Sequence, residues 1–258
     1  MDPIVIDSIL IASVAFFAAL VQAATGFGFA IVALPFLLLI MGNLGAVGLT
    51  IMLNLLVSLV LVPGLWRQAP WGPLTRLSLG SVLGFPIGLA IFLQASLDWV
   101  RLAVGLVILF FAAWLALHAR PDVPEPAIPK ANIPAARPGL EILVGVLSGA
   151  MTTALAMPGP AVMLYLSASG MGKVPLRACT LCLFTLSYGA ALALQGAADT
   201  ISGQIWQIAA LAALPTILGA ITGNCISSKL DERLFHILVL AILLATGAFT
   251  TFLAILAW

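Results

Sequence analysis

Two short motifs interrupt long apolar stretches of this chain, and their residue types suit the binding of a small anion. The first break, Thr25–Gly28, has the sequence Thr-Gly-Phe-Gly, and the second break, Met157–Pro160, has the sequence Met-Pro-Gly-Pro. Glycine lets a backbone approach a ligand closely, and proline is tolerated in the first turn of a helix. A helix that restarts after such a break presents unpaired N–H groups and about half a unit of positive charge. Each break therefore predicts an anion site that needs no buried Arg or Lys.

Polar side chains near both breaks can add donors to this site. The candidate substrate-binding residues are Gln22, Thr25, Gly26, Phe27, Gly28, Asn54, Thr152, Thr153, Pro158 and Gly159. The helix that ends before each break also offers carbonyl oxygens with about half a unit of negative charge, so a coupling cation is an alternative or additional ligand. Packing alone is a further alternative, because glycine and proline are common in membrane helices.

The other reactive residues do not form an enzymatic or metal site. Cys179 and Cys182 make a C-x-x-C motif in an apolar run without a second pair, which is typical of small buried side chains. The two histidines, His118 and His236, lie far apart near segment ends, and no H-E-x-x-H motif occurs. Catalysis requires polar groups within reach of one another. We therefore expect no enzyme, no metal site and no cofactor.

The composition places both breaks in a membrane protein. Of the 258 residues, 63% are hydrophobic and only 7% are charged, whereas a soluble domain averages about 25% charged residues. The net charge of +1 gives no electrostatic footprint for nucleic acid. Asp2 and Asp7 stand where a cleaved signal peptide has basic residues, so the first apolar stretch is expected to be a membrane helix. The expected fold class is an all-α polytopic membrane protein in contact with the lipid bilayer.

Apolar segments divide the chain into two similar halves. The first half has Ile4–Ala24, Phe27–Met41, Leu44–Val62, Pro73–Leu93 and Trp99–Leu117, and the second has Leu140–Ala156, Gly159–Ser169, Val174–Gln195, Ile205–Cys225 and Leu234–Trp258. As helices, Phe27–Met41 and Gly159–Ser169 are about 22 and 16 Å long, too short for a hydrocarbon core of about 30 Å. Short interrupted segments at matching places in two halves are typical of a transporter's binding site.

A linker rich in proline separates the halves. It spans residues 119–138 and contains six prolines, a composition typical of an extended aqueous segment. The expected units are therefore a first membrane repeat at 1–118 and a second at 139–258. An offset of 130 places Thr50 on Thr180, and an offset of 135 places Gly84 on Gly219 and Gly88 on Gly223.

The positive charges predict that the two repeats are inverted. If each half crosses the membrane an odd number of times, nine of the ten Lys and Arg residues share one side and Arg101 alone lies on the other. Eight crossings would split the charges five and five, against the positive-inside rule. We therefore expect a cytoplasmic linker and both termini outside, in the periplasm.

For two further sets of residues we expect a structural role rather than ligand binding. Glycines at four-residue spacing are typical of close helix contacts rather than of ligand sites; they are Gly80, Gly84, Gly88, Gly145, Gly149, Gly219 and Gly223. Lys173 and Arg177 flank the start of a helix, where we expect a topology signal. Guidance of an anion from the cytoplasm is the alternative for these two residues.

Together these features resemble the sulfite exporter TauE/SafE family of bacterial membrane proteins over the whole chain. The resemblance rests on Gly26–Phe29 followed by Pro35, on Gly149 leading to Pro158–Pro160, on the central linker, and on Leu-Gly-x-x-x-Gly in the fourth segment of each half. The family's run of consecutive glycines is reduced here to Gly-x-Gly and Pro-Gly-Pro. The resemblance implies a transporter of the inner membrane for the export or uptake of sulfite, a sulfonate or a related organic anion, and a secondary exporter is our first expectation. From the two breaks, we expect the anion to bind near the midplane.

Other functions stay open at this point. One alternative is a transporter of another organic anion that is coupled to a cation, and another is a structural membrane subunit without a ligand. A passive channel would need a continuous polar lining along several helices, for which these segments are too apolar. The sequence leaves the identity of the anion, the direction of transport, its driving force and a homo-oligomeric state open.

Overall fold

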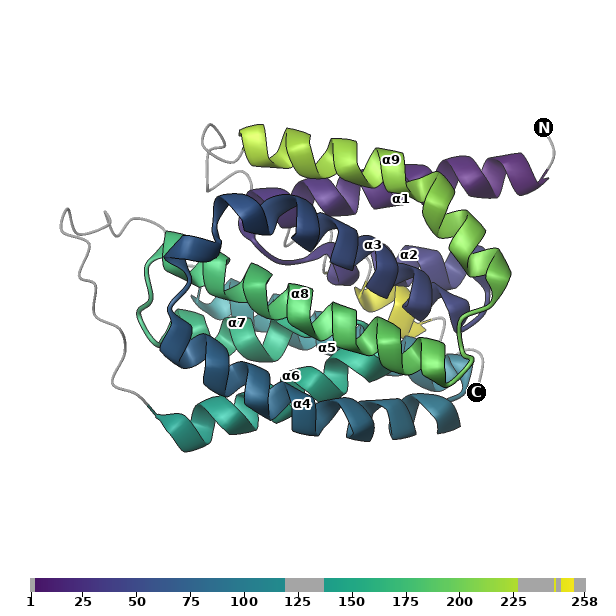
Figure 1. The fold of residues 1–258 in the computed structure, drawn as a ribbon. Coiled ribbons are helices and arrows are strands. Elements are labelled where there is room, and N and C mark those ends of the chain that lie inside the picture. Colours follow the sequence, from purple (N-terminus) through teal and green to yellow (C-terminus); the bar gives the residue numbers. More distant parts are fainter. Residues whose placement is uncertain (1–2, 119–136, 227–243, 245–246, 253–258) are drawn as a thin grey trace.

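The computed structural model describes residues 3–118, 137–226, 244 and 247–252, and every regular element in these ranges is a helix (Figure 1). The helices of the first half are α1 (Pro3–Thr25), α2 (Phe29–Met41), α3 (Gly45–Leu61), α4 (Trp71–Gln94) and α5 (Leu97–His118). Those of the second half are α6 (Pro138–Leu155), α7 (Gly159–Ala168), α8 (Lys173–Ala197) and α9 (Gly203–Ile226). Two short 3₁₀ turns, η1 (Val62–Gly64) and η2 (Trp66–Gln68), join α3 to α4.

Seven of these helices are long and apolar enough to cross a membrane, which confirms a polytopic helical membrane protein. Only α2 and α7, with 13 and 10 residues, are too short among the described helices. Large apolar side chains on the outside of the bundle, such as Leu79, Leu83 and Leu211, are exposed. Helices satisfy all their backbone hydrogen bonds internally, and for this reason such apolar segments adopt them in lipid.

The predicted segments correspond to these nine helices within a few residues. Residues 247–252 of the tenth segment are helical, and they pack on α5, where a Cβ on Gly105 would lie 3.0 Å from the Thr251 nitrogen. The rest of Leu234–Trp258 lies outside the described residues, except residue 244. So does the linker apart from Arg137 and Pro138, and Pro138 is already the first residue of α6.

The two halves interlock through two close helix pairs. Figure 1 shows α1 beside α9 and α4 beside α6, with α3 and α8 between the pairs. A Cβ on Gly84 of α4 would lie 2.8 Å from the Ala150 nitrogen of α6, and a Cβ on Gly219 of α9 would lie 3.0 Å from the Phe16 carbonyl carbon of α1. Glycine is thus needed at both crossings because the backbones themselves are in contact.

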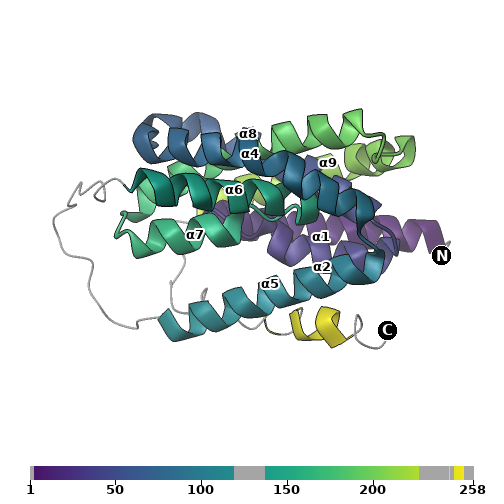
Figure 2. The same cartoon turned by 90° about the horizontal axis from the view of Figure 1, so that it is seen from below.

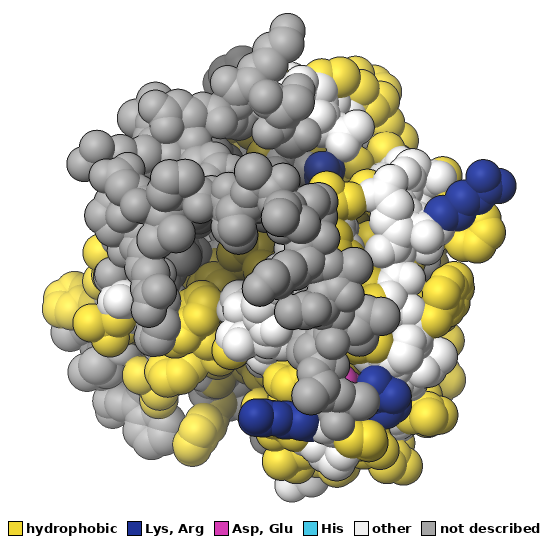
Figure 3. Space-filling model, turned by 90° about the vertical axis from the view of Figure 1, so that its left-hand side faces the viewer, with side chains coloured by type: hydrophobic (Ala, Val, Ile, Leu, Met, Phe, Trp, Pro, Cys, Tyr) yellow, Lys and Arg dark blue, Asp and Glu magenta, His cyan; other side chains and the backbone are white. Residues whose placement is uncertain are grey.

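The helices run between two opposite ends of the bundle. Figures 1 and 2 show that α5 ends, and α6 begins, at the end opposite to the start of α1. We call this the linker end, because His118 and Pro138 flank the linker there. Figure 3 looks onto the linker end and shows several Lys and Arg side chains on it.

Candidate functional site

The first break has a backbone that requires glycine. After α1 ends at Thr25, Gly26 has a φ of +88° and Gly28 has a φ of +111°, and α2 then starts at Phe29. Both φ values lie in the left-handed region that other residues rarely adopt. The Thr25 hydroxyl lies 2.8 Å from the Val21 carbonyl oxygen and accepts a bond from the Phe27 N–H at 3.3 Å. Thr25 therefore shapes the break and uses its hydroxyl locally.

Gln22 links the two helices on either side of the first break. Its Oε1 accepts a hydrogen bond of 3.1 Å from the backbone N–H of Phe29, the first residue of α2. The side chain is completely buried, and its Nε2 has no hydrogen-bond partner. Leaving a buried donor unpaired costs about 1–3 kcal/mol, so Gln22 remains a candidate binding residue.

The second break is held by side chains from neighbouring helices. Ala156, with a φ of +55°, ends α6, and its carbonyl oxygen accepts a 3.0 Å bond from the Tyr188 hydroxyl. The Ser148 hydroxyl donates to the Pro158 carbonyl at 3.0 Å, and Gln195 Nε2 donates to the Thr153 carbonyl at 3.0 Å. The carbonyls before α7 are therefore capped by neutral donors.

A small cavity of about 10 Å³ lies between the two breaks. Its lining residues come from α1, α2, α3, α7 and α8 and from both breaks; they are Gln22, Gly28, Ala30, Ile31, Asn54, Met157, Gly159, Pro160, Phe184 and Tyr188. A volume of this size holds about one water molecule. Binding of a larger anion therefore requires the breaks or the aromatic side chains to move.

Asn54 and Tyr188 form a polar pair at this cavity. Asn54 Nδ2 donates to the Tyr188 hydroxyl at 2.6 Å, and the hydroxyl in turn donates to the Ala156 carbonyl. Asn54 is 1% exposed, and its Oδ1 has no partner. Asn54 in α3 and Gln22 in α1 thus both line the cavity, and each has one amide atom without a partner, an acceptor on Asn54 and a donor on Gln22.

Four of the ten candidate residues line this cavity: Gln22, Gly28, Asn54 and Gly159. The other six, Thr25, Gly26, Phe27, Thr152, Thr153 and Pro158, lie in or beside the breaks but not on the cavity wall. The hydroxyls of Thr152 and Thr153 bond to the carbonyls of Ser148 at 2.7 Å and Phe85 at 2.9 Å. These two threonines therefore hold α6 together and tie it to α4.

Tyr188 was missed by the sequence analysis. It is one of only two tyrosines in the chain, and it lies in the middle of the apolar segment Val174–Gln195. A tyrosine hydroxyl at that depth needs a hydrogen-bond partner, and this need is the feature of the sequence that points to Tyr188. Its partner Asn54 lies 134 positions earlier, close to the offset that relates the two halves.

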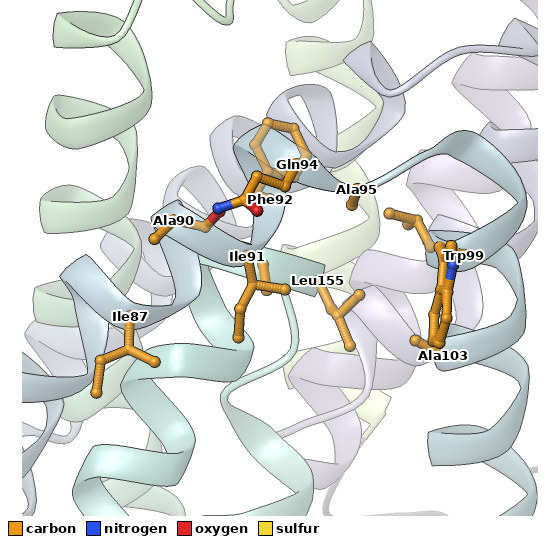
Figure 4. Close-up of a pocket in the computed structure, with 11 residues that line it drawn as sticks. Ile87, Ala90, Ile91, Phe92, Gln94, Ala95, Trp99, Ala103 and Leu155 are labelled. Carbon is orange, nitrogen blue, oxygen red and sulfur yellow. The ribbon is translucent and has the colours of Figure 1, made fainter.

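Two larger cavities are less suited to an anion. One of 610 Å³ lies between the end of α4, the start of α5 and the end of α6 (Figure 4). Its wall is mainly apolar, with Ile87, Ile91 and Leu155, and carries no charged side chain. The other, of 510 Å³, lies near the start of α1 and includes the carboxylate of Asp7, which would repel an anion.

Three arginines have defined partners. Arg76 pairs with the buried carboxylate of Glu141, and Arg101 pairs with Asp98 at 3.1 Å. Arg177 reaches the first break, where it donates to the Ala23 carbonyl. Among the described residues, no group of three or more His, Cys, Asp or Glu side chains could hold a metal ion.

Comparison with known proteins gives one match. A family model described as "Sulfite exporter TauE/SafE" matches residues 11–250, a range that includes both breaks and the cavity between them. No curated protein and no solved structure matches the chain significantly.

Proposed function

Since the chain belongs to the TauE/SafE sulfite exporter family, we propose that it exports sulfite, or an organosulfonate, across the bacterial inner membrane and binds it between the two breaks. Members of this family are membrane transporters and not enzymes. The proposed class of substrate follows from the family match. The position of the site is our inference from the geometry.

The observation that carries the site is the unpaired amide donor of Gln22, a residue that lines the cavity. The first-turn N–H groups of α2 and α7, at Ala30, Ile31 and Gly159, have no acceptor within their own helices. Each helix start adds about half a unit of positive charge. A small oxyanion with three or four acceptor oxygens would satisfy these donors together.

Inverted repeats are our proposal for how this site is built. The halves exchange helices, because each of the two close pairs joins one helix of the first half to one of the second: α4 packs on α6, and α1 packs on α9. The contacts correspond as well: Gly84 contacts Val146 and Gly219 contacts Phe16, and the offsets of 135 and 130 residues found in the sequence relate Gly84 to Gly219 and Phe16 to Val146. This exchange supports residues 1–118 and 139–258 as the repeating units.

We further propose that the linker end faces the cytoplasm and that both termini lie outside. Most described positive residues are on elements at the linker end; they are Arg67 in η2, Arg76 in α4, Arg137 before α6, and Lys173 and Arg177 in α8. Arg101 lies in the second turn of α5, at the opposite end. This distribution agrees with the positive-inside rule.

The proposed function is tested with purified protein in liposomes. Sulfite, methanesulfonate, taurine, sulfate and acetate are loaded in turn, and their release is followed with and without a sodium gradient. We expect release of sulfite or a sulfonate well above protein-free liposomes, and little release of acetate. Release of acetate alone would contradict a sulfur-containing substrate, and no release of any anion would favour the structural-subunit alternative.

A further inference from the structure

Arg177 makes contacts that a simple topology signal does not need. It lies in the second turn of α8, and its Nη2 donates both to the Ala23 carbonyl in the last turn of α1 and to Asn224 Oδ1 at 2.8 Å. Its Cγ lies 2.7 Å from the place where a Cβ on Gly26 would be. The bare backbone of Gly26 thus makes room for this side chain beside the first break.

The charge of Arg177 has no carboxylate partner among the described residues. Glu141 pairs with Arg76 and Asp98 pairs with Arg101. The partners of Arg177 are a carbonyl and an amide oxygen, and its buried Nε has no partner. A charge that is partly removed from water and not neutralised acts strongly on its surroundings.

This charge lies where the site would otherwise be negative. The last carbonyls of α1 carry about half a unit of negative charge and lie directly before the first break. The guanidinium on the Ala23 carbonyl outweighs them. The second break has no such charge, because Tyr188 and Gln195 cap the carbonyls of Ala156 and Thr153 with neutral groups.

We infer that Arg177 sets the charge preference of the site, so that the cavity between the breaks accepts an anion and rejects a cation. Arg177 does not line the cavity. It acts through the end of α1 and through its field, and it is therefore a selectivity residue rather than a ligand. The inference rests on the proposed function, which places the anion between the breaks. The end of α1 is negative and the start of α2 is positive, so the helices alone leave open whether the cavity binds an anion or a cation. The charge of Arg177 decides in favour of an anion.

The test measures sulfite affinity by calorimetry on folded protein in detergent. Arg177→Gln removes the charge, and Arg177→Lys retains it. We expect the Kd for sulfite to rise at least about tenfold in Arg177→Gln and to stay within about threefold of the parent in Arg177→Lys. Arg67→Gln is the matched control, since it removes an exposed positive charge at the same end of the bundle, and it should leave the Kd unchanged.

Asn224→Asp keeps Arg177 in place and therefore tests the inference even if Arg177→Gln does not fold. A carboxylate at this exposed position would pair with the guanidinium and cancel its charge. We expect the Kd for sulfite to rise several-fold, whereas the neutral variant Asn224→Ser should bind sulfite with less than about a threefold change.

The outcomes separate this inference from the proposed function. If Arg177→Gln or Asn224→Asp bound sulfite with the same Kd as the parent, Arg177 would only hold α1, α8 and α9 together. The proposal of sulfite transport would be unaffected. Binding of acetate or nitrate in place of sulfite, weakened by Arg177→Gln, would overturn the substrate and retain the role of Arg177. A parent protein that binds sodium and no anion would overturn both.

Discussion

At the scale of residues, the proposed site uses a side-chain amide and backbone N–H groups rather than charged ligands. Gln22 is the central side chain of the proposed site, because its Oε1 accepts a hydrogen bond from the first residue of α2, its Nε2 has no partner, and the residue lines the cavity. Neutral donors bind an anion less tightly than Arg or Lys does, because the charge of those side chains adds to the hydrogen bond. A transporter has to release its substrate, and this arrangement permits release.

Replacement of Gln22 tests this role. Gln22→Leu keeps the approximate volume and removes both hydrogen bonds. We expect sulfite affinity to fall at least about tenfold, because a hydrogen bond to a charged group contributes about 1.5–3 kcal/mol. Calorimetry gives the Kd, and Gln94→Leu, at an exposed amide in α4, is the control. Equal affinity in Gln22→Leu and the parent would remove Gln22 from the site.

Sequence reasoning found the breaks but only part of the cavity wall. Gly-x-Gly and Pro-Gly-Pro identify where a helix must stop, because those backbones cannot continue it. The rotation of each helix decides which side chains face the cavity, and apolar segments without a polar face do not reveal it. Thr152 and Thr153 were therefore expected in the site but bond to α6 and α4. The role of Arg177 depends on its contact with Ala23 of α1, which lies 154 positions earlier in the sequence.

At the scale of elements, the glycines on one face of α4, α6 and α9 let these helices pack closely in pairs around the short helices α2 and α7. The boundaries of the long helices followed from the length of the apolar runs. The start of α4 at Trp71, before the expected Pro73, shows that proline is tolerated in a first turn. The glycine spacing in α4, α6 and α9 predicted close contacts, and the backbones of α4 and α6 indeed meet at Gly80 and Gly145, where the Cβ-to-Cα separation would be only 2.9 Å.

Leucine at a crossing should therefore impair folding rather than slow transport. Gly84→Leu and Gly219→Leu would each force a side chain into the backbone of the facing helix, which requires the pair to separate. We expect a lower folded yield and a fall in melting temperature for both variants, measured by size exclusion and thermal unfolding in detergent.

Gly189→Leu provides the comparison, since a Cβ there would meet nothing within 4 Å. Leucine at Gly189 should leave the yield and the melting temperature close to those of the parent. If Gly84→Leu and Gly219→Leu behaved in the same way, the glycine faces would not be close-packing devices.

At the scale of the whole molecule, two interlocked halves place one break from each half beside a shared cavity. The charged residues of the linker end and the position of Arg101 at the other end predict the orientation of the molecule in the membrane. The remainder of the tenth segment lies outside the described residues. The proposed topology therefore rests on the charge distribution and on the positions of the end of α5 and the start of α6.

Cysteine labelling of intact cells tests this orientation. In a variant without native cysteines, Gln68→Cys lies at the linker end and Ser202→Cys lies before α9 at the other end; both side chains are exposed. A membrane-impermeant maleimide should label Ser202→Cys in intact cells and Gln68→Cys only after lysis. The reverse pattern would place the linker outside and contradict the proposed topology.

The most direct measurement of the central claim is sulfite flux through a variant in which the cavity is filled. Gly28 is a poor choice because its φ of +111° would strain any side chain. Gly159 starts α7 without that constraint, and a Cβ there would lie 3.4 Å from Phe184 Cζ, at the cavity wall. We predict that Gly159→Val abolishes sulfite flux in liposomes while the melting temperature stays near that of the parent, and that Gly189→Val transports normally. Flux through Gly159→Val at the parent rate would show that the anion does not pass between the breaks.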